Sequence, residues 1–253
     1  MVESVRLVEE AIKTTEKKKR IDIIDAARGF SVLLMVIHHA FYDIYAFLDG
    51  PEWIYRNPYF MFLQIIFIGI FIFVSGIASR FSRGNIERGA IVMVFAIIIT
   101  YVTVRMESPI YFGILHLLGS FMIFYGLTRK LWDNIPRVAA PCIYISLIIL
   151  SVLARECWSP VSDNPVIRDL LSVFGWRQER WVNADYQSVL PWIFVFLLGT
   201  WVGEYIREGK FPKWFYKTNI PFLPLVGRNA LAIYMLHQPV LYGLTMLVLY
   251  LRT

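Results

Sequence analysis

The stretch RGFSVLLMVIHHAF, residues 28–41, places an arginine and a histidine in one long apolar run. Arg28 and His39 are eleven positions apart, which on an α-helix corresponds to three turns plus only about 20°. Both side chains therefore project from the same helix face, about 16 Å apart along the axis. Ionisable groups are costly at membrane depth and usually have a function there. The pair predicts a site inside a membrane helix, with a cation near one surface and a titratable base deeper on the same face.

The whole chain has the composition of a polytopic membrane protein. Of its 253 residues, 57% are hydrophobic and 16% are aromatic, more than a soluble core needs. Apolar stretches of about 17–25 residues, the length of a membrane-spanning helix, recur along it. Because backbone polar groups in lipid must be satisfied within the segment, we expect an all-α fold. The seven predicted spans are 23–47, 58–79, 89–105, 110–131, 138–154, 187–205 and 229–250.

The basic residues predict how these spans are oriented. Lysine and arginine gather before the first span and in every second connection, whereas the other connections are acidic or balanced. By the positive-inside rule, the N-terminus is expected in the cytoplasm and the C-terminus outside. The net charge of +6 thus reflects loop asymmetry. No basic run is interleaved with aromatic residues, so no nucleic-acid partner is expected. The residues assigned to the cytoplasm are Lys17, Lys18, Lys19, Arg20, Arg80, Arg83, Arg88, Arg129, Lys130, Arg137, Arg207, Lys210, Lys213, Lys217 and Arg228.

The chain is expected to form one transmembrane domain over residues 21–253. Residues 1–20 precede it as a cytoplasmic segment, either an amphipathic interfacial helix or a solvated tail. The long connection 155–186 is expected outside, and its stretch PVIRDLLSVFGW has the pattern of a short surface helix. Whether this connection is a lid or a simple surface connector stays open. Cys142 and Cys157 are too far apart on one predicted helix to form a disulfide.

Three histidines are candidates for chemistry in the membrane. A histidine in a membrane helix often only hydrogen-bonds a neighbouring helix. His39 is favoured as a general base because it is aligned with Arg28, and a neutral imidazole can take a proton from a hydroxyl or amine near physiological pH. His116 lies in FGILHLLG, about a third of the way into the fourth span, and His237 lies near the middle of the seventh, in YMLHQP.

Arginines at the expected cytoplasmic ends have two interpretations each. Arg80 and Arg83 close the second span with the spacing i and i+3, which suits a pyrophosphate or a 3′-phosphate but also a simple topology anchor. Arg28 follows Asp25 by three residues, as an ion pair or as an arginine oriented toward an anionic ligand. Arg228 begins the last span and is likewise an anchor or a phosphate ligand.

Smaller polar features complete the candidate site. Ser75 and its neighbour Gly76 permit close helix approach, or line a narrow tunnel. Asp185 and Tyr186 open the sixth span at its outer edge. A carboxylate stabilises a helix N-terminus by itself, and there it could also bind a sugar or an amine. The sequence contains no P-loop and no Cys/His cluster with metal-ligand spacing, so no metal is expected.

These motifs resemble those of the transmembrane acyltransferase superfamily, and most closely the bacterial branch of the heparan-alpha-glucosaminide N-acetyltransferase catalytic-domain family. Four stretches carry the resemblance: IDIIDAARGFSVLLMVIHH, FGILHLLG, DYQSVLPWIFVFLLGTWVG and GRNALAIYMLHQPVL. The related acyltransferase-three family has an arginine, ten intervening residues and a histidine in its first span, which Arg28 and His39 fit. It also has an RxxR on a cytoplasmic loop, which Arg80 and Arg83 fit.

One departure from the family concerns the catalytic histidine. The lysosomal enzymes look to have an asparagine at the position of His39, with their catalytic histidine further along in the luminal stretch. The corresponding stretch here, FLDGPEWIYRNPY, contains no histidine. The catalytic role is therefore expected to move to His39.

The resemblance implies an acyl-CoA-dependent O- or N-acyltransferase in a bacterial or archaeal cell membrane. It would move an acyl group, in the first instance acetyl, from cytosolic acyl-CoA to a hydroxyl or amine of a sugar, glycolipid or cell-wall acceptor outside. His39 would be the general base, and His116 would orient the acceptor or donate to the oxyanion. The other assigned residues are Arg28 as a catalytic group; Arg80, Arg83, Arg228 and Ser75 for the acyl-CoA; and Asp185, Tyr186 and His237 for the acceptor.

Two alternatives remain open at this point. The same histidines could form the proton path of a proton-coupled transporter or flippase for a small polar solute. The chain could also be a non-catalytic membrane subunit. Partners other than acyl-CoA, the acceptor and the bilayer are not predicted, except that a homodimer is compatible with the sequence.

Overall fold

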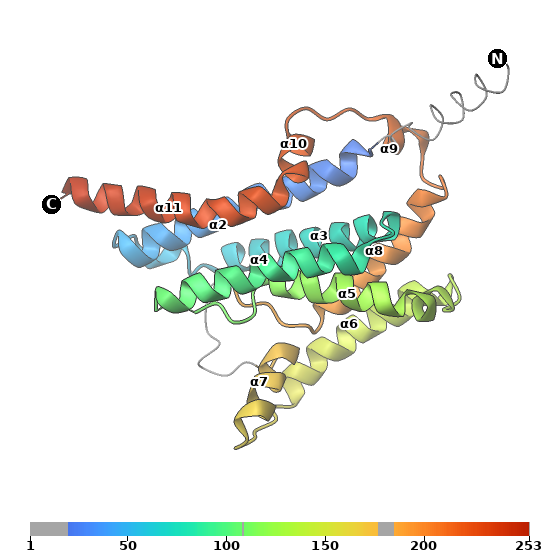
Figure 1. Cartoon of the computed structure of the whole chain (residues 1–253), viewed down its shortest axis with the longest axis horizontal. Helices are drawn as coiled ribbons and strands as arrows, with labels where there is room; N and C mark the ends of the chain where they lie inside the picture. Colours follow the sequence, from blue (N-terminus) through green and yellow to red (C-terminus); the bar gives the residue numbers. More distant parts are fainter. Residues whose placement is uncertain (1–19, 108, 177–184, 253) are drawn as a thin grey trace, which may run out of the picture.

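The computed structural model describes residues 20–107, 109–176 and 185–252, and within these ranges the chain is all-α, as expected (Figure 1). Helices occupy all seven predicted spans. They are α2 (Asp22–Phe47), α3 (Pro58–Phe81), α4 (Asn85–Arg105), α5 (Ile114–Asp133), α6 (Ala139–Cys157), α8 (Trp192–Arg207) and α11 (Ala230–Arg252). Shorter elements join them: the 3₁₀-helix η1 (Glu52–Ile54), α7 (Pro165–Phe174), α9 (Lys213–Lys217) and α10 (Leu223–Arg228).

Within the described ranges, five segments are long and apolar enough to cross a membrane. They are α2, the segment Glu52–Phe81 (which contains η1 and α3), α4, α6 and α11. The other two helices differ. α8 has only 16 residues, and α5 carries three charged side chains in its last two turns. These two helices nevertheless supply several of the best-buried apolar side chains, each at most 2% exposed. They are Leu117, Phe121 and Tyr125 of α5 and Phe196 and Leu197 of α8.

The outward faces of the surrounding helices are apolar. Large hydrophobic side chains are exposed along α4 and α6, where a soluble protein would carry polar residues. This surface fits a hydrocarbon environment. The exposed side chains on these two helices include Ile91, Val94, Ile97, Ile98, Ile145, Ile149, Leu150 and Leu153.

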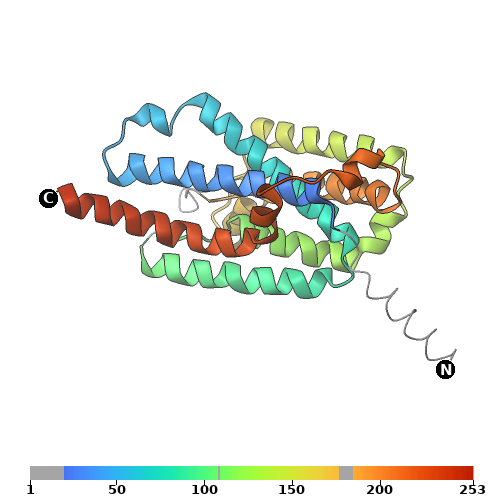
Figure 2. The same cartoon turned by 90° about the horizontal axis from the view of Figure 1, so that it is seen from above.

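Helix crossings in this fold depend on glycine. A methyl group added at Gly76 of α3 would lie 2.1 Å from the carbonyl oxygen of Phe196 in α8, and one added at Gly199 would lie 2.1 Å from that of Phe73. Gly29 of α2 and Gly227 of α10 approach each other's helix backbones as closely. Such contacts let helices pack in lipid, where burial of apolar surface does not drive association. In Figure 2, α2 lies between α3 and α11.

The starts of three helices differ from the prediction by four or five residues; α4 begins earlier than expected, at Asn85 instead of residue 89, and α5 and α8 begin later. Residues 110–113 and 187–191 were expected to be helical, but α5 begins at Ile114 and α8 at Trp192. The two segments pair instead, through a bridge between Gly113 and Tyr186 and a bond from the Gln187 N–H to the Phe112 carbonyl oxygen (3.1 Å). Non-helical backbone is tolerated at membrane depth where protein surrounds it.

Side chains of α4 hold the first of these segments. The Ile110 N–H donates to Thr103 Oγ1 (3.0 Å), and Thr100 Oγ1 donates to the Ile110 carbonyl oxygen (2.6 Å). In the second segment, Pro191 disfavours a helical conformation for the residue before it.

The remaining structural predictions divide into two groups. The short helix within connection 155–186 is confirmed as α7, capped by Asn164, whose Oδ1 accepts from the Val166 N–H (2.9 Å). Cys142 and Cys157 are free. The predictions for the N-terminal segment fall on residues 1–19, and part of the long connection falls on 177–184; both lie outside the described residues.

Candidate active site

A small, partly open cavity lies where α2, α3 and α11 meet the non-helical segments before α5 and α8. Its walls are mainly apolar, with a few polar groups directed into it, which is the usual composition of a small-molecule site. The lining residues are Ser31, Val32, Met35, His38, His39, Gln64, Phe67, Ile68, Phe71, Ile114, Asp185, Gln187 and Tyr234.

His39 of α2 lines this cavity with one ring nitrogen engaged. Its Nδ1 lies 3.0 Å from the carbonyl oxygen of Met35. Because a carbonyl oxygen only accepts, the proton of the neutral ring is on Nδ1 and the lone pair is on Nε2. The His39 ring packs edge-on against His237 of α11, with centroids 4.8 Å apart. His39 is therefore oriented as a base whose free nitrogen is Nε2.

His237 has the same tautomer. Its Nδ1 donates to the carbonyl oxygen of Tyr234 (2.6 Å), and its Nε2 is buried without a partner among the described residues. His237 contacts the ring of His39 but does not itself line the cavity. The packing of α2 against α11 thus brings two of the predicted histidines, His39 and His237, into contact.

Asp185 lies in the cavity rather than at the outer edge of a helix. Its Oδ2 accepts from the Tyr234 hydroxyl (2.5 Å) and packs on Gly113, where an added methyl would lie only 2.3 Å away. The carboxylate is thus fixed between α11 and the N-terminus of α5, whose partial positive charge favours it. Tyr186 points elsewhere, because its hydroxyl donates to the Ser172 carbonyl oxygen of α7 (2.5 Å).

His116 lies in the first turn of α5, closer to the helix start than the sequence suggested. Its Nδ1 accepts from the Gly113 N–H (3.2 Å) and its Nε2 lies 3.1 Å from Thr100 Oγ1. Since the Thr100 hydroxyl donates to Ile110, Nε2 carries the proton and donates to Thr100. Both ring nitrogens of His116 are therefore engaged in holding the α5 N-terminus.

Arg28 and Arg228 share one acidic cluster at the other end of α2. Arg28 pairs with Asp25 (3.1 Å), and Arg228 pairs with Asp25 (3.2 Å) and Asp22 (2.7 Å). α2 is unbroken from Asp22 to Phe47, so the expected rise from Arg28 to His39 holds. Arg28 does not line the cavity.

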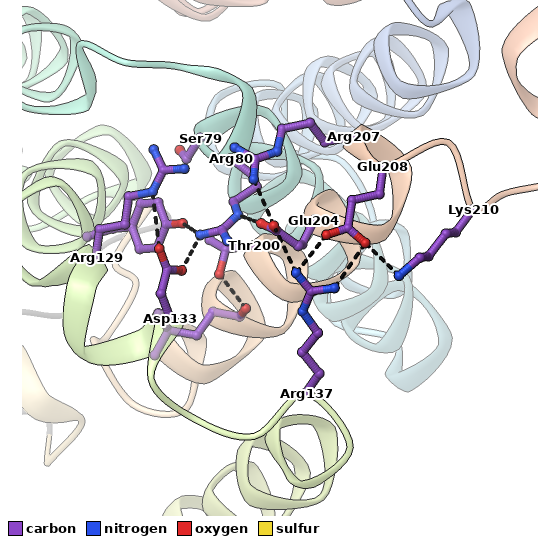
Figure 3. A network of polar contacts seen from close by, with 12 residues as sticks. Ser79, Arg80, Arg129, Asp133, Arg137, Thr200, Glu204, Arg207, Glu208 and Lys210 are labelled. Carbon is purple, nitrogen blue, oxygen red and sulfur yellow. Dashed lines mark hydrogen bonds and ion pairs between the residues drawn. The ribbon is translucent and has the colours of Figure 1, made fainter.

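The RxxR pair is divided between two environments. Arg80 ends α3 inside a network of ion pairs (Figure 3) and is only 10% exposed. Its guanidinium donates to Glu204 and Asp133 and, at 2.8 Å, to the phenolic oxygen of Tyr125. Arg83 is exposed and has no ion pair within the described ranges. Ser75, one turn before Arg80 on α3, donates to the Phe71 carbonyl oxygen (2.7 Å).

The more exposed part of the same network joins the start of α6 to the end of α8. Arg137, just before α6, donates to Glu208 at 2.6 and 3.0 Å, and Lys210 pairs with the same carboxylate at 2.7 Å. The Arg137 guanidinium, assisted by Lys210, lowers the pKa of the Glu208 carboxyl to about 2. The network therefore fixes the ends of α3, α5 and α8 and the start of α6 at one end of the molecule.

Five polar residues of the cavity were not predicted as site residues from the sequence: Ser31, His38, Gln64, Gln187 and Tyr234. Gln64 interrupts an otherwise apolar run, MFLQIIF, and such an isolated polar residue in a span is itself a functional signal. Gln187 and Tyr234 gave no comparable signal. Among the described residues no group of three or more His, Cys, Asp and Glu could hold a metal ion.

Comparison with known proteins gives one result. Comparisons with curated proteins and with solved structures returned no significant match. A family model described as heparan-alpha-glucosaminide N-acetyltransferase, catalytic, matches residues 20–239, which include every candidate site residue discussed above. Since the match covers most of the chain, this protein belongs to the heparan-alpha-glucosaminide N-acetyltransferase catalytic family.

Proposed function

We propose that the chain is an integral-membrane acetyltransferase that uses cytosolic acetyl-CoA, the acetyl donor of the family, to acetylate an amine or hydroxyl of a sugar-like acceptor outside. The observation that carries this proposal is His39, which lines a mainly apolar cavity and whose Nε2 has no hydrogen-bond partner among the described residues. Such a nitrogen can act as a general base. The apolar walls would limit hydrolysis of the thioester by keeping water out.

The donor would bind from the end of the molecule that holds the arginines. Arg83 is exposed and unpaired within the described ranges, and Arg88 and Arg20 are near enough to Arg28 to act on it electrostatically. These cations suit the phosphates of CoA. The pantetheine arm would then follow α2, past Ser75 of the neighbouring α3, over the rise of about 16 Å that separates Arg28 from His39.

The transfer itself needs one base and one leaving thiolate. As the acceptor attacks the thioester carbonyl, His39 Nε2 takes the acceptor proton. The carbon–sulfur bond of the tetrahedral intermediate then breaks, and the thiolate receives that proton, which yields acetylated acceptor and CoA thiol. Asp185, which lines the cavity, would bind the acceptor, and His237, which does not line it, would support the ring of His39. His116, with both nitrogens engaged, would position the α5 N-terminus.

The proposed arrangement in the membrane follows the charges. We place seven helices across a bacterial or archaeal cell membrane, with the N-terminus in the cytoplasm and the C-terminus outside. Ion pairs link the ends of α3 and α5, the start of α6 to the end of α8, and the start of α2 to Arg228. All of these helix ends were expected on the cytoplasmic side. A single basic end supports a single cytoplasmic face.

The test compares binding with turnover in His39→Ala. Purified wild-type protein should bind acetyl-CoA by calorimetry and release CoA thiol in the presence of glucosamine, the first acceptor to try. His39→Ala should bind acetyl-CoA within a few-fold of wild type and lose turnover by about 10²–10⁴-fold. Full turnover in His39→Ala would exclude it as the base. Absence of acyl-CoA binding, with proton-coupled solute uptake in proteoliposomes, would favour the transporter.

A further inference from the structure

Acyl transfer creates a negative oxygen that this cavity must stabilise. When the acceptor attacks the thioester carbonyl, that oxygen becomes an oxyanion, and donors aimed at it usually provide the largest share of catalysis. No lysine or arginine is among the residues that line the cavity. The donors must therefore be neutral groups, which are also cheaper than cations to bury at membrane depth.

Most neutral donors near the cavity are already used. The Ser31 hydroxyl donates to the Ala27 carbonyl oxygen (3.0 Å), and the Tyr234 hydroxyl donates to Asp185. The ring N–H of His39 donates to the backbone, and His116 donates to Thr100. These groups cannot turn to an oxyanion without giving up an existing bond.

Three neutral donors remain among the described lining residues: the imidazole of His38, whose ring is stacked on Phe60 with centroids 4.9 Å apart, and two carboxamides. Gln64 of α3 and Gln187 of the segment before α8 both line the cavity, and neither side chain has a hydrogen-bond partner in the part of the chain that the structure describes. Both are half-buried. Gln64 is on a long helix, and the backbone of Gln187 is pinned to Phe112 by its own N–H (3.1 Å), so rigid elements carry both side chains.

We propose that Gln64 and Gln187 form the oxyanion hole of this site. The Nε2 hydrogens of the two side chains, from two different walls, donate to the oxygen of the tetrahedral intermediate while His39 holds the acceptor proton. No proton moves to or from either carboxamide, so the reaction balance is unchanged. Both residues touch the reacting atoms and are catalytic in this sense. The inference rests on the proposed acetyltransferase function.

The test removes the donors while keeping the side-chain length. Gln64→Met and Gln187→Met should each lower kcat for thiol release by about 10²–10³-fold, while acetyl-CoA affinity stays within a few-fold. Gln238→Met is the matched control, because Gln238 is a carboxamide in α11 that bonds Asp43 (3.0 Å) and does not line the cavity. It should retain kcat within a few-fold.

Folding is checked separately with S-ethyl-CoA, which lacks the carbonyl and should bind all variants alike. If a methionine variant fails to bind it, Gln64→Glu and Gln187→Glu replace the donor by an acceptor in the same shape and should be at least as inactive. Variants that bind S-ethyl-CoA and keep wild-type kcat would overturn the oxyanion hole. A wild-type protein that neither binds acetyl-CoA nor releases thiol would instead overturn the acetyltransferase proposal.

Discussion

The two arginines of the RxxR motif, Arg80 and Arg83, have different environments and therefore different expected roles. Arg80 is enclosed by Glu204, Asp133 and Tyr125, whereas Arg83 is exposed and unpaired within the described ranges. From the sequence, both residues had the same two interpretations, a phosphate ligand or a topology anchor. The contacts instead favour Arg80 as the residue that fixes the helix ends, and leave Arg83 available for an anion.

This difference predicts opposite consequences for two alanine variants. Arg83→Ala should weaken acetyl-CoA binding by about 10- to 100-fold, because it removes a charge-assisted contact worth about 1.5–3 kcal/mol, and leave the melting temperature unchanged. Arg80→Ala should lower stability by about 3–5 kcal/mol, since Glu204 is then left buried without its main partner. Calorimetry and thermal melting in the same detergent separate the two effects. If Arg80→Ala melts like wild type and only binding suffers, Arg80 is a ligand after all.

Some features of individual site residues follow from the sequence, and others depend on the tertiary structure. The distance between Arg28 and His39 follows from helix geometry alone, because both lie on one unbroken element. The tautomer of His39 and the bond between Tyr234 and Asp185 depend on which elements meet, and nothing local encodes that. The positions of site residues could therefore be predicted where they share one helix, and could not be predicted where residues from several elements meet.

At the scale of elements, the glycine crossings set how closely the helices pack. A methyl at Gly76 would lie 2.1 Å from a backbone oxygen of α8, which no side-chain rearrangement can relieve. Gly76→Ala should therefore destabilise the protein by at least about 1–3 kcal/mol, the usual range for overpacking. Gly243→Ala is the control, because an added methyl there has nothing within 4 Å and alanine is the better helix former.

Denaturation midpoints in one detergent measure both glycine variants. Gly243→Ala should melt at or above the wild-type temperature, and Gly76→Ala clearly below it. Equal midpoints for the two variants would mean that α3 and α8 can separate at no cost, which would contradict the packing described here.

Element boundaries were predicted to within three residues for four of the seven long helices, and the starts of α4, α5 and α8 were missed by four or five residues. The segments 110–113 (IYFG) and 187–191 (QSVLP) were included in the predicted spans, although Gly113 and Pro191 are themselves signals against a continuous helix. What makes them extended is tertiary: hydroxyls of Thr100 and Thr103 on α4 for the first, and pairing between the two segments. These breaks are also where the cavity forms, which agrees with the frequent use of interrupted helices at membrane binding sites.

At the scale of the whole molecule, the proposed function requires the arginine-rich end to face cytosolic acetyl-CoA. This end contains the network of Figure 3 and the acidic cluster of Arg28 and Arg228. Most of its carboxylates are engaged by arginine, yet the basic residues remain in excess, so the end keeps a net positive charge. Such a surface suits both the cytoplasmic leaflet and a phosphate-rich donor.

Cysteine labelling in intact cells tests this orientation. In a background without Cys142 and Cys157, which are both exposed, Val161→Cys lies on a fully open loop position, 88% exposed. It should react with an impermeant maleimide from outside. Lys213→Cys, exposed at the start of α9, should react only after the membrane is opened. The reverse pattern would put the arginines outside, away from cytosolic acetyl-CoA. The donor path along α2 would then be impossible even if His39 proved essential, because the thioester would have to reach the cavity from the end without phosphate ligands.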